Sequence, residues 1–132
     1  GCAAQACMHC RRAANISAFV HRTTGPIMST PTLANVTLDP KANVYFGGKC
    51  VSHSFTLADG TRKSVGVVLS AQLTFSTGAA EVMECVAGDC EYKLAGSDSW
   101  QKSGPGERFA VPAHSSFDIR VADAYHYICH YA

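Results

Sequence analysis

Apolar side chains occupy every second position of the stretch Phe117-Asp118-Ile119-Arg120-Val121-Ala122. This period of two is typical of a β-strand with one buried face and one exposed face. Comparable runs rich in valine, phenylalanine, tyrosine and threonine recur along the chain, separated by glycine, proline, aspartate and serine. The nine predicted strands are Val44–Phe46, Cys50–Leu57, Ser64–Leu69, Gln72–Ser76, Glu81–Ala87, Glu91–Leu94, Arg108–Val111, Ser116–Val121 and Tyr125–Tyr131. The sequence therefore predicts an all-β domain, either a β-sandwich or a closed β-barrel.

The strand-rich part of the chain follows a segment of different composition. Prolines recur within Thr24–Pro40, which predicts an extended linker. Within the strand-rich part, Asp59-Gly60 predicts a β-hairpin because both residues tolerate positive φ. We therefore expect an N-terminal extension and linker over residues 1–42 and a barrel domain over residues 43–132.

The 132 residues carry 11 lysines and arginines against 10 aspartates and glutamates, a formal net charge of +1. This balance argues against a nucleic-acid partner, and no apolar stretch has the length of a membrane span. The charges are uneven, because the residues before Met28 include three arginines and no acidic residue. The rest of the chain is mildly acidic, so it would have to bind an anionic substrate through a few local cations and donors.

The chain has seven cysteines, an odd number without paired close spacings. We therefore expect reduced thiols and a cytoplasmic protein rather than a disulfide scaffold. Cys7-Met8-His9-Cys10 supplies half of a zinc or redox motif, which leaves a metalloenzyme as one alternative. The simpler interpretation is that residues 1–27 form an extension upstream of a natural start at Met28 and contribute nothing to function.

Two motifs in the strand-rich part have the spacing of cupin motifs. Glu81-x6-Gly88 resembles the end of the first cupin motif, and Gly106-x5-Pro112 resembles the beginning of the second. The resemblance implies a single cupin-type double-stranded β-helix, also called a jelly-roll barrel, behind an N-terminal extension.

The cupin metal ligands are missing from this sequence. Metal-binding cupins place two histidines shortly before the glutamate and a third shortly after the proline. Phe75-Ser76-Thr77 and Phe117 stand at those places here. Because these residues are not competent ligands for a first-row divalent ion, the resemblance implies a barrel without a metal site.

A closer resemblance covers residues 43–131. Its motifs are Asn43-Val44-Tyr45-Phe46-x-Gly48-Lys49, Ser64-Val65-Gly66-Val67, Leu73-Thr74-Phe75-Ser76-Thr77, Glu81-x-Met83, Trp100, Phe109-x-Val111-Pro112-Ala113-His114-Ser115-x-Phe117 and Tyr127-Ile128-Cys129-x-Tyr131. In these motifs the chain is similar to the small cupin family of pyrimidine/purine nucleoside phosphorylases. No part of residues 1–42 contributes to the similarity.

The resemblance implies a metal-independent pentosyltransferase that converts nucleosides and phosphate to free base and ribose 1-phosphate. It implies broad tolerance of purine and pyrimidine bases, inorganic phosphate as co-substrate without a cofactor, and a homodimer. A non-catalytic sensory cupin that binds a nucleoside-like or sugar ligand is the alternative. Composition and spacing alone establish only a metal-free β-barrel with a small pocket.

The implied reaction assigns catalytic roles to three residues. Positive charge develops on the sugar while the base leaves with negative charge, so the site must stabilise both. Glu81 is expected to accept the ribose hydroxyls, and His114 to protonate the base or bind phosphate. Thr77 is expected to donate its hydroxyl, so that Thr77→Val would reduce turnover more than thermal stability. Each residue also has a structural alternative. Glu81 could hold a loop in place, His114 could be an exposed side chain without a role, and the Thr77 hydroxyl could cap the end of a strand.

Six further residues are expected to bind the substrates. They are Lys49, Arg62, Ser76, Phe75, Phe117 and Tyr45. The two cations would hold phosphate, and the serine would donate a hydrogen bond to phosphate or ribose. The aromatic rings would stack on the base, which suits broad specificity because every nucleobase has a π-face. In the structural alternative, the two cations are solvated surface charges, the serine hydroxyl caps a strand end, and the aromatic side chains belong to the barrel core.

Overall fold

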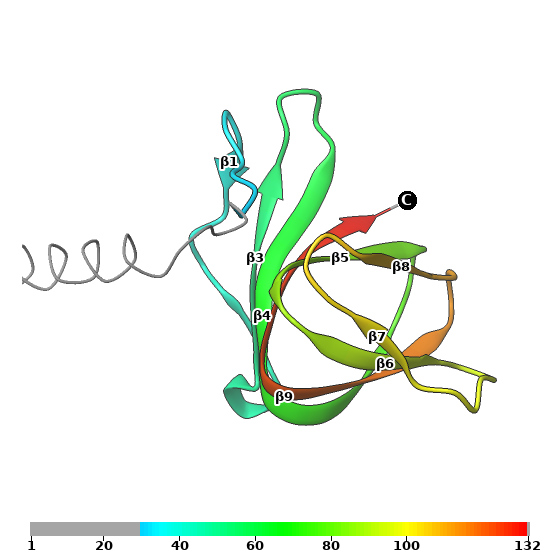
Figure 1. Cartoon of the computed structure of the whole chain (residues 1–132). Helices are drawn as coiled ribbons and strands as arrows, with labels where there is room; N and C mark the ends of the chain where they lie inside the picture. Colours follow the sequence, from blue (N-terminus) through cyan, green and yellow to red (C-terminus); the bar gives the residue numbers. More distant parts are fainter. Residues whose placement is uncertain (1–29, 132) are drawn as a thin grey trace, which may run out of the picture.

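The structure is a computed structural model that describes residues 30–131. These residues form a nine-stranded antiparallel β-structure with one short 3-10 turn (Figure 1). The elements are β1 (Thr37–Leu38), β2 (Asn43–Tyr45), η1 (Phe46–Gly48), β3 (Cys50–Thr56), β4 (Arg62–Ser76), β5 (Glu81–Gly88), β6 (Cys90–Leu94), β7 (Gln101–Ser103), β8 (Arg108–Val111) and β9 (Ser116–Tyr131). The predicted all-β fold is confirmed.

The two longest strands, β4 and β9, shape the barrel. They pair with each other along most of their length, and Figure 1 shows both of them curving around one end of the molecule. A β-bulge between Leu69 and Ala71 interrupts their register, and bulges bend strands in this way. The first part of β9 pairs with β6 and its last part pairs with β5. One continuous strand therefore joins the two halves of the barrel.

The sequence predicted a pair of strands in place of each long strand, and this was wrong. Ser64–Leu69 and Gln72–Ser76 belong to the single strand β4, and Ser116–Val121 and Tyr125–Tyr131 belong to the single strand β9. Of the residues between the predicted strands, Ala71 pairs with Val121 and Ala124 pairs with Leu69, and the β-bulge carries the strands past the others without ending them. Strand pairing thus overrides the low local β-propensity of these residues.

The side chains on the inner faces of the strands form a single hydrophobic core. Phe117, Ile119 and Val121 belong to it, with at most 5% of each residue exposed. Asp118 and Arg120 lie between them in sequence and face outward, with side chains 33% and 41% exposed. The alternation predicted for this stretch is confirmed.

A second bulge, between Cys85 and Ala87, lies where β5 pairs with β9. Gly88 ends β5 with a φ of 71°. A Cβ atom at this position would overlap the carbonyl group of Ala124 on β9. Gly88 therefore allows the two backbones to approach closely where the chain reverses.

The structure adds two short strands that the sequence did not predict. β1 lies within the predicted linker Thr24–Pro40 and pairs with β3, Thr37 opposite Thr56. β7 pairs with β6. The hairpin at Asp59-Gly60 is confirmed, since Gly60 donates its backbone N–H to Leu57 and β3 pairs with β4 on either side. The predictions for residues 1–27, including Cys7-Met8-His9-Cys10, fall outside the described residues.

Candidate functional site

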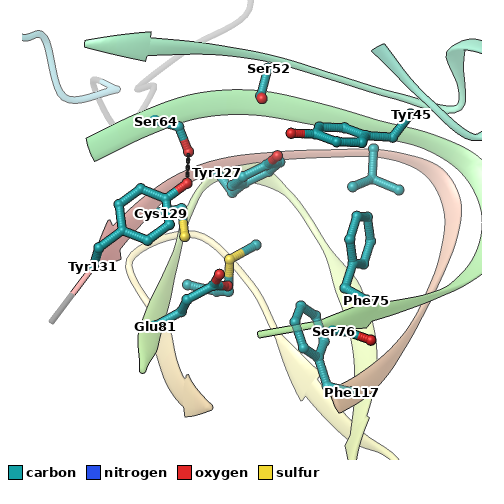
Figure 2. Close-up of a pocket in the computed structure, with 12 residues that line it drawn as sticks. Tyr45, Ser52, Ser64, Phe75, Ser76, Glu81, Phe117, Tyr127, Cys129 and Tyr131 are labelled. Atoms are coloured by element: carbon teal, nitrogen blue, oxygen red, sulfur yellow. Dashed lines mark hydrogen bonds between the residues drawn. The ribbon is translucent and has the colours of Figure 1, made fainter. Parts of the chain in front are cut away.

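A partly open cavity of about 160 Å³ lies inside the barrel. Its lining comes from strands on both sides of the barrel, so only the folded chain brings these side chains together. The lining residues are Tyr45, Ser52, Ser64, Val68, Phe75, Ser76, Glu81, Met83, Phe117, Tyr127, Cys129 and Tyr131 (Figure 2). Five of the nine predicted site residues are among them: Tyr45, Phe75, Ser76, Glu81 and Phe117.

Polar side chains gather at one end of the cavity. Figure 2 shows Ser64, Tyr131, Cys129 and Glu81 together there. The hydroxyl groups of Ser64 and Tyr131 are hydrogen-bonded at 3.0 Å. Cys129 also lines the cavity, on the same face of β9 as Tyr131 and directly opposite Ser64 of β4. This end of the cavity offers hydroxyl, thiol and carboxyl groups side by side.

Burial sets the protonation of these groups. Burial raises the pKa of Glu81 above its ordinary value, and the hydrogen bond from Cys129 acts in the opposite direction. Burial also raises the pKa of Cys129 to about 12, with the nearby Glu81 charge adding to the effect. For Tyr131, burial raises the pKa to about 12. At neutral pH the thiol and the phenol are therefore hydrogen-bond donors, and they are not nucleophiles.

Aromatic rings form the opposite end of the cavity. Phe75 and Phe117 are directly opposite each other on β4 and β9, with ring centroids 5.6 Å apart and planes 22° apart. Phe46, in the turn after β2, packs edge-on against Phe75 at 5.3 Å. Tyr45 lies at the same end, and 46% of the residue is exposed (Figure 2). This end therefore presents flat apolar faces with few polar atoms.

Tyr127 forms the wall between the two ends, as Figure 2 shows. Its hydroxyl lies 3.5 Å from the Sγ atom of Cys50, and burial raises its pKa well above the usual range. A Cβ atom at position 66 would lie 2.6 Å from the same hydroxyl oxygen. Gly66 is thus required for Tyr127 to occupy this position.

Thr77 and His114 lie together in two adjoining turns outside the cavity lining. The Thr77 hydroxyl donates to the carbonyl of Pro112 at 2.6 Å and accepts from the backbone N–H of Ser115 at 3.0 Å. His114 is exposed, has a φ of 52°, and donates its backbone N–H to Gly78. The Thr77 hydroxyl is therefore occupied by backbone groups, and the catalytic roles of both residues stay predictions.

Lys49 and Arg62 are exposed and do not line the cavity. Among residues 30–131, no lysine, arginine or histidine lines the cavity, and Glu81 is the only carboxylic acid in its lining. Lys49 directly follows the turn that contains Phe46, and this turn packs against the aromatic end. Of the predicted cations, Lys49 is thus joined by its backbone to that end of the site.

Seven lining residues were not predicted as site residues from the sequence: Ser52, Ser64, Val68, Met83, Tyr127, Cys129 and Tyr131. A usable signal existed in the strand Tyr125–Tyr131, since its period of two places Tyr127, Cys129 and Tyr131 on one face. What the sequence lacks is the register that brings this face opposite Ser64 and Glu81.

Within residues 30–131, no three histidine, cysteine, aspartate or glutamate side chains are close enough to hold a metal ion together. None of the helices in this part of the chain combines the length and apolar character needed to cross a membrane.

Residues 40–131 match the family model described as pyrimidine/purine nucleoside phosphorylase. The chain belongs to this family. A pyrimidine/purine nucleoside phosphorylase of Ralstonia nicotianae is 72% identical over 105 residues, which cover 80% of this chain and 100% of the relative. A pyrimidine/purine nucleoside phosphorylase of Delftia acidovorans is 70% identical over 105 residues, which again cover 80% of this chain and 100% of the relative. The family expected from the sequence motifs is confirmed.

Solved structures agree with the membership in the pyrimidine/purine nucleoside phosphorylase family and with the cupin fold. A protein of unknown function from Acinetobacter sp. ADP1 is 40% identical, with a TM-score of 0.75 over 76% of this chain and 98% of that chain. An RmlC-like cupin from Shewanella frigidimarina is 14% identical, with a TM-score of 0.55 over 69% of this chain and 81% of that chain, a likeness in fold alone. The predicted cupin-type jelly-roll barrel is confirmed.

Proposed function

We propose that the protein is a nucleoside phosphorylase that converts nucleosides and inorganic phosphate to free base and ribose 1-phosphate. The observation that carries this proposal is the division of one cavity into an aromatic end and a carboxyl-hydroxyl end. A nucleoside has the same division, with a flat base joined to a hydroxyl-bearing sugar. The names of the relatives, 72% and 70% identical, support the same activity.

We propose that the base lies against Phe75, Phe117 and Tyr45. Stacking on such rings contributes about 1–3 kcal/mol per base and does not depend on which base is present. Among the described lining residues, Ser76 and Tyr45 bring hydroxyl groups to this end (Figure 2). Because this end offers few hydrogen-bond partners for the polar edges of a base, the site is expected to tolerate both purines and pyrimidines.

The ribose is proposed to lie at the polar end, with its hydroxyls on Glu81. A carboxylate accepts hydrogen bonds from two hydroxyls, and its negative charge stabilises the positive charge that develops at the anomeric carbon. Because Glu81 is partly buried and shielded from bulk water, this interaction is stronger than it would be in solvent. No metal ion takes part in this scheme, and Glu81 supplies the stabilising charge.

Phosphate is proposed to bind at the rim of the cavity. Inside the cavity it would meet Glu81 and no cation, which is unfavourable for an anion. The Ser76 hydroxyl is exposed at the rim, and the Lys49 ammonium follows the turn that packs on the aromatic end. A cavity of about 160 Å³ is below the roughly 300–1,000 Å³ that encloses a drug-sized ligand, so part of the substrates lies outside it.

The decisive experiment incubates the protein with uridine or adenosine, with and without inorganic phosphate, and measures free base and ribose 1-phosphate by chromatography. We expect both products only with phosphate, and a loss of at least about 100-fold in Glu81→Gln from the removed transition-state charge. Metal removal by a chelator is expected to leave the rate unchanged. Base release without phosphate would indicate hydrolysis instead. Binding without any product would favour the non-catalytic sensory cupin.

The homodimer and the cytoplasmic location are also proposed. An open sheet leaves unpaired edge groups, and pairing with a second copy is one way of covering them. Sedimentation equilibrium of the purified chain is expected to give twice the monomer mass.

A further inference from the structure

We infer that Phe46 is a specificity-determining residue that contacts the six-membered ring of a purine base and so favours purine nucleosides over pyrimidine nucleosides. The inference rests on the proposed function, because it takes the base to lie at the aromatic end of the cavity and the ribose at Glu81. Phe46 belongs to the sequence motif Tyr45-Phe46-x-Gly48-Lys49, of which the proposed reaction uses only Tyr45 and Lys49.

The ring of Phe46 lies at the rim of the cavity. It packs edge-on against Phe75, with ring centroids 5.3 Å apart and planes 85° apart, and Phe75 in turn stacks on Phe117. Phe75 and Phe117 line the cavity, as does Tyr45, the residue directly before Phe46 (Figure 2). Phe46 is outside the lining and in contact with it, so its ring extends the aromatic end of the cavity outward.

The backbone holds Phe46 in a conformation that favours glycine. Its φ is 52°, and Gly47 and Gly48 follow with φ values of 64° and 98°. A bulky side chain rarely occupies this left-handed region. The backbone N–H of Lys49 closes the turn by donating to the carbonyl of Phe46 at 3.3 Å. The chain thus keeps an aromatic side chain where the backbone alone would favour glycine, which indicates that the ring itself is used.

Packing within the protein uses only part of this ring. Phe46 is 49% exposed, although a large apolar side chain gains from being covered. Tyr45, beside it, is half-exposed as well. The cavity of about 160 Å³ encloses only part of a nucleoside, so the outer part of a bound base lies at the rim. The free surface of Phe46 is therefore available to cover that part of the base.

Purines and pyrimidines differ in how far they extend from the sugar. A purine is joined to ribose through its five-membered ring, so its six-membered ring extends beyond the space that a pyrimidine fills. With the ribose at Glu81, this outer ring reaches the rim where Phe46 lies. A base stacked parallel to Phe75 meets Phe46 edge to face, which is a favoured arrangement of aromatic rings. Phe46 therefore adds a contact that pyrimidine nucleosides lack.

The test measures kcat and KM of the wild type and Phe46→Ala with adenosine and with uridine at saturating phosphate. Alanine keeps the Cβ atom, so the backbone requirement at a φ of 52° is unchanged and only the ring is lost. We expect KM for adenosine to rise about tenfold, the size of one lost stacking contact, and KM for uridine to rise less than about threefold. kcat should change little with either substrate, because the contact is present both before and during the reaction.

Two matched variants sharpen the comparison. Phe46→Trp keeps a flat ring and should retain the wild-type preference for adenosine. Leu38→Ala removes an apolar side chain of similar exposure, 52%, from β1 outside the cavity lining, and should leave both KM values unchanged. Equal losses for adenosine and uridine in Phe46→Ala, or no change in either, overturn the inference. A lower mass of Phe46→Ala than of the wild type in sedimentation equilibrium would assign the ring to a contact between two copies, and also overturns it.

A second measurement does not depend on turnover. Equilibrium dialysis without phosphate gives the Kd of adenosine and of uridine for the wild type and Phe46→Ala. A rise in Kd that is larger for adenosine than for uridine supports the inference, and equal changes overturn it. If the wild type binds nucleosides but releases no base with phosphate, the proposed function fails, and the dialysis still decides the role of Phe46. If the wild type binds neither nucleoside, both proposals fail.

Discussion

The hydroxyl group of Thr77 connects the turn after β4 to the turn between β8 and β9. It is buried, and both of its polar partners are backbone groups of the turn that carries His114. Thr77→Val keeps the shape and removes the hydroxyl, leaving the Pro112 carbonyl and the Ser115 N–H without a partner. We expect this to lower the free energy of unfolding by about 1–3 kcal/mol.

Denaturant unfolding measures this change, with Thr77→Ser as the matched control that retains the hydroxyl. The sequence predicted that Thr77→Val would reduce turnover more than stability. The structural contacts favour the reverse, with kcat/KM per folded molecule nearly unchanged. A large loss of kcat/KM at unchanged stability would establish the catalytic role instead.

At the scale of elements, a polar network joins four adjacent strands on the side of the sheet away from the cavity. Lys63 of β4 contacts His130 of β9 at 2.6 Å, and His130 contacts Glu84 of β5 at 2.7 Å. Arg108 of β8 completes the series with a 3.0 Å contact to Glu84. Because Lys63 can only donate, the Nδ1 atom of His130 accepts from it, and the Nε2–H of His130 donates to Glu84.

Glu84→Ala is expected to reduce stability by about 1 kcal/mol, since two donors lose their shared acceptor while the Glu84 side chain is only 18% exposed. Asp118→Ala is the comparison, because its contact with Lys93 is 3.9 Å long, both side chains are about one-third exposed, and its 2.7 Å hydrogen bond from the Thr74 hydroxyl is exposed to solvent. Chemical unfolding of the two variants measures the difference. Equal losses would contradict a stabilising role for the network.

The local alternation of apolar and polar residues predicted much of the fold and less of the candidate site. The alternation around Ile119 located a strand and its buried face, because period-two burial is a local property. The continuity of β4 and β9 was missed, since it depends on pairing partners far away in sequence. For the same reason Glu81 was predicted and Tyr131, its cross-strand neighbour, was not.

At the scale of the whole molecule, buried thiols begin the loss of stability at alkaline pH, and buried tyrosines such as Tyr125 and Tyr127 add to it above about pH 10, where unfolded tyrosines ionise. Burial raises the pKa of Cys85 to about 11 and of Cys90 and Cys129 to about 12. In the unfolded chain, thiols ionise at about pH 8.5, so above this pH the unfolded state binds fewer protons than the folded state. Stability is therefore complete below about pH 8.5 and falls as pH rises toward the folded pKa values, by up to about 1.4 kcal/mol per pH unit for each thiol.

Thermal unfolding between pH 7 and pH 11 is expected to show a Tm that falls progressively above about pH 8.5. Cys90→Ala removes one of these groups, so its Tm should fall less steeply with pH even though its Tm at pH 7 is lower. An identical slope in the variant would show that Cys90 does not contribute.

The continuity of β9 has a consequence for engineering the enzyme. Phe117 at the aromatic end and Tyr131 at the polar end of the cavity belong to the same strand, which pairs with the equally continuous β4 on both sides of the bulge. No flexible connection separates these two ends, so the distance between them is set by the covalent chain. A library intended to accept bulkier nucleosides should therefore shorten side chains such as Phe75 or Phe117, because lengthening the surface loops would leave the cavity at its present size.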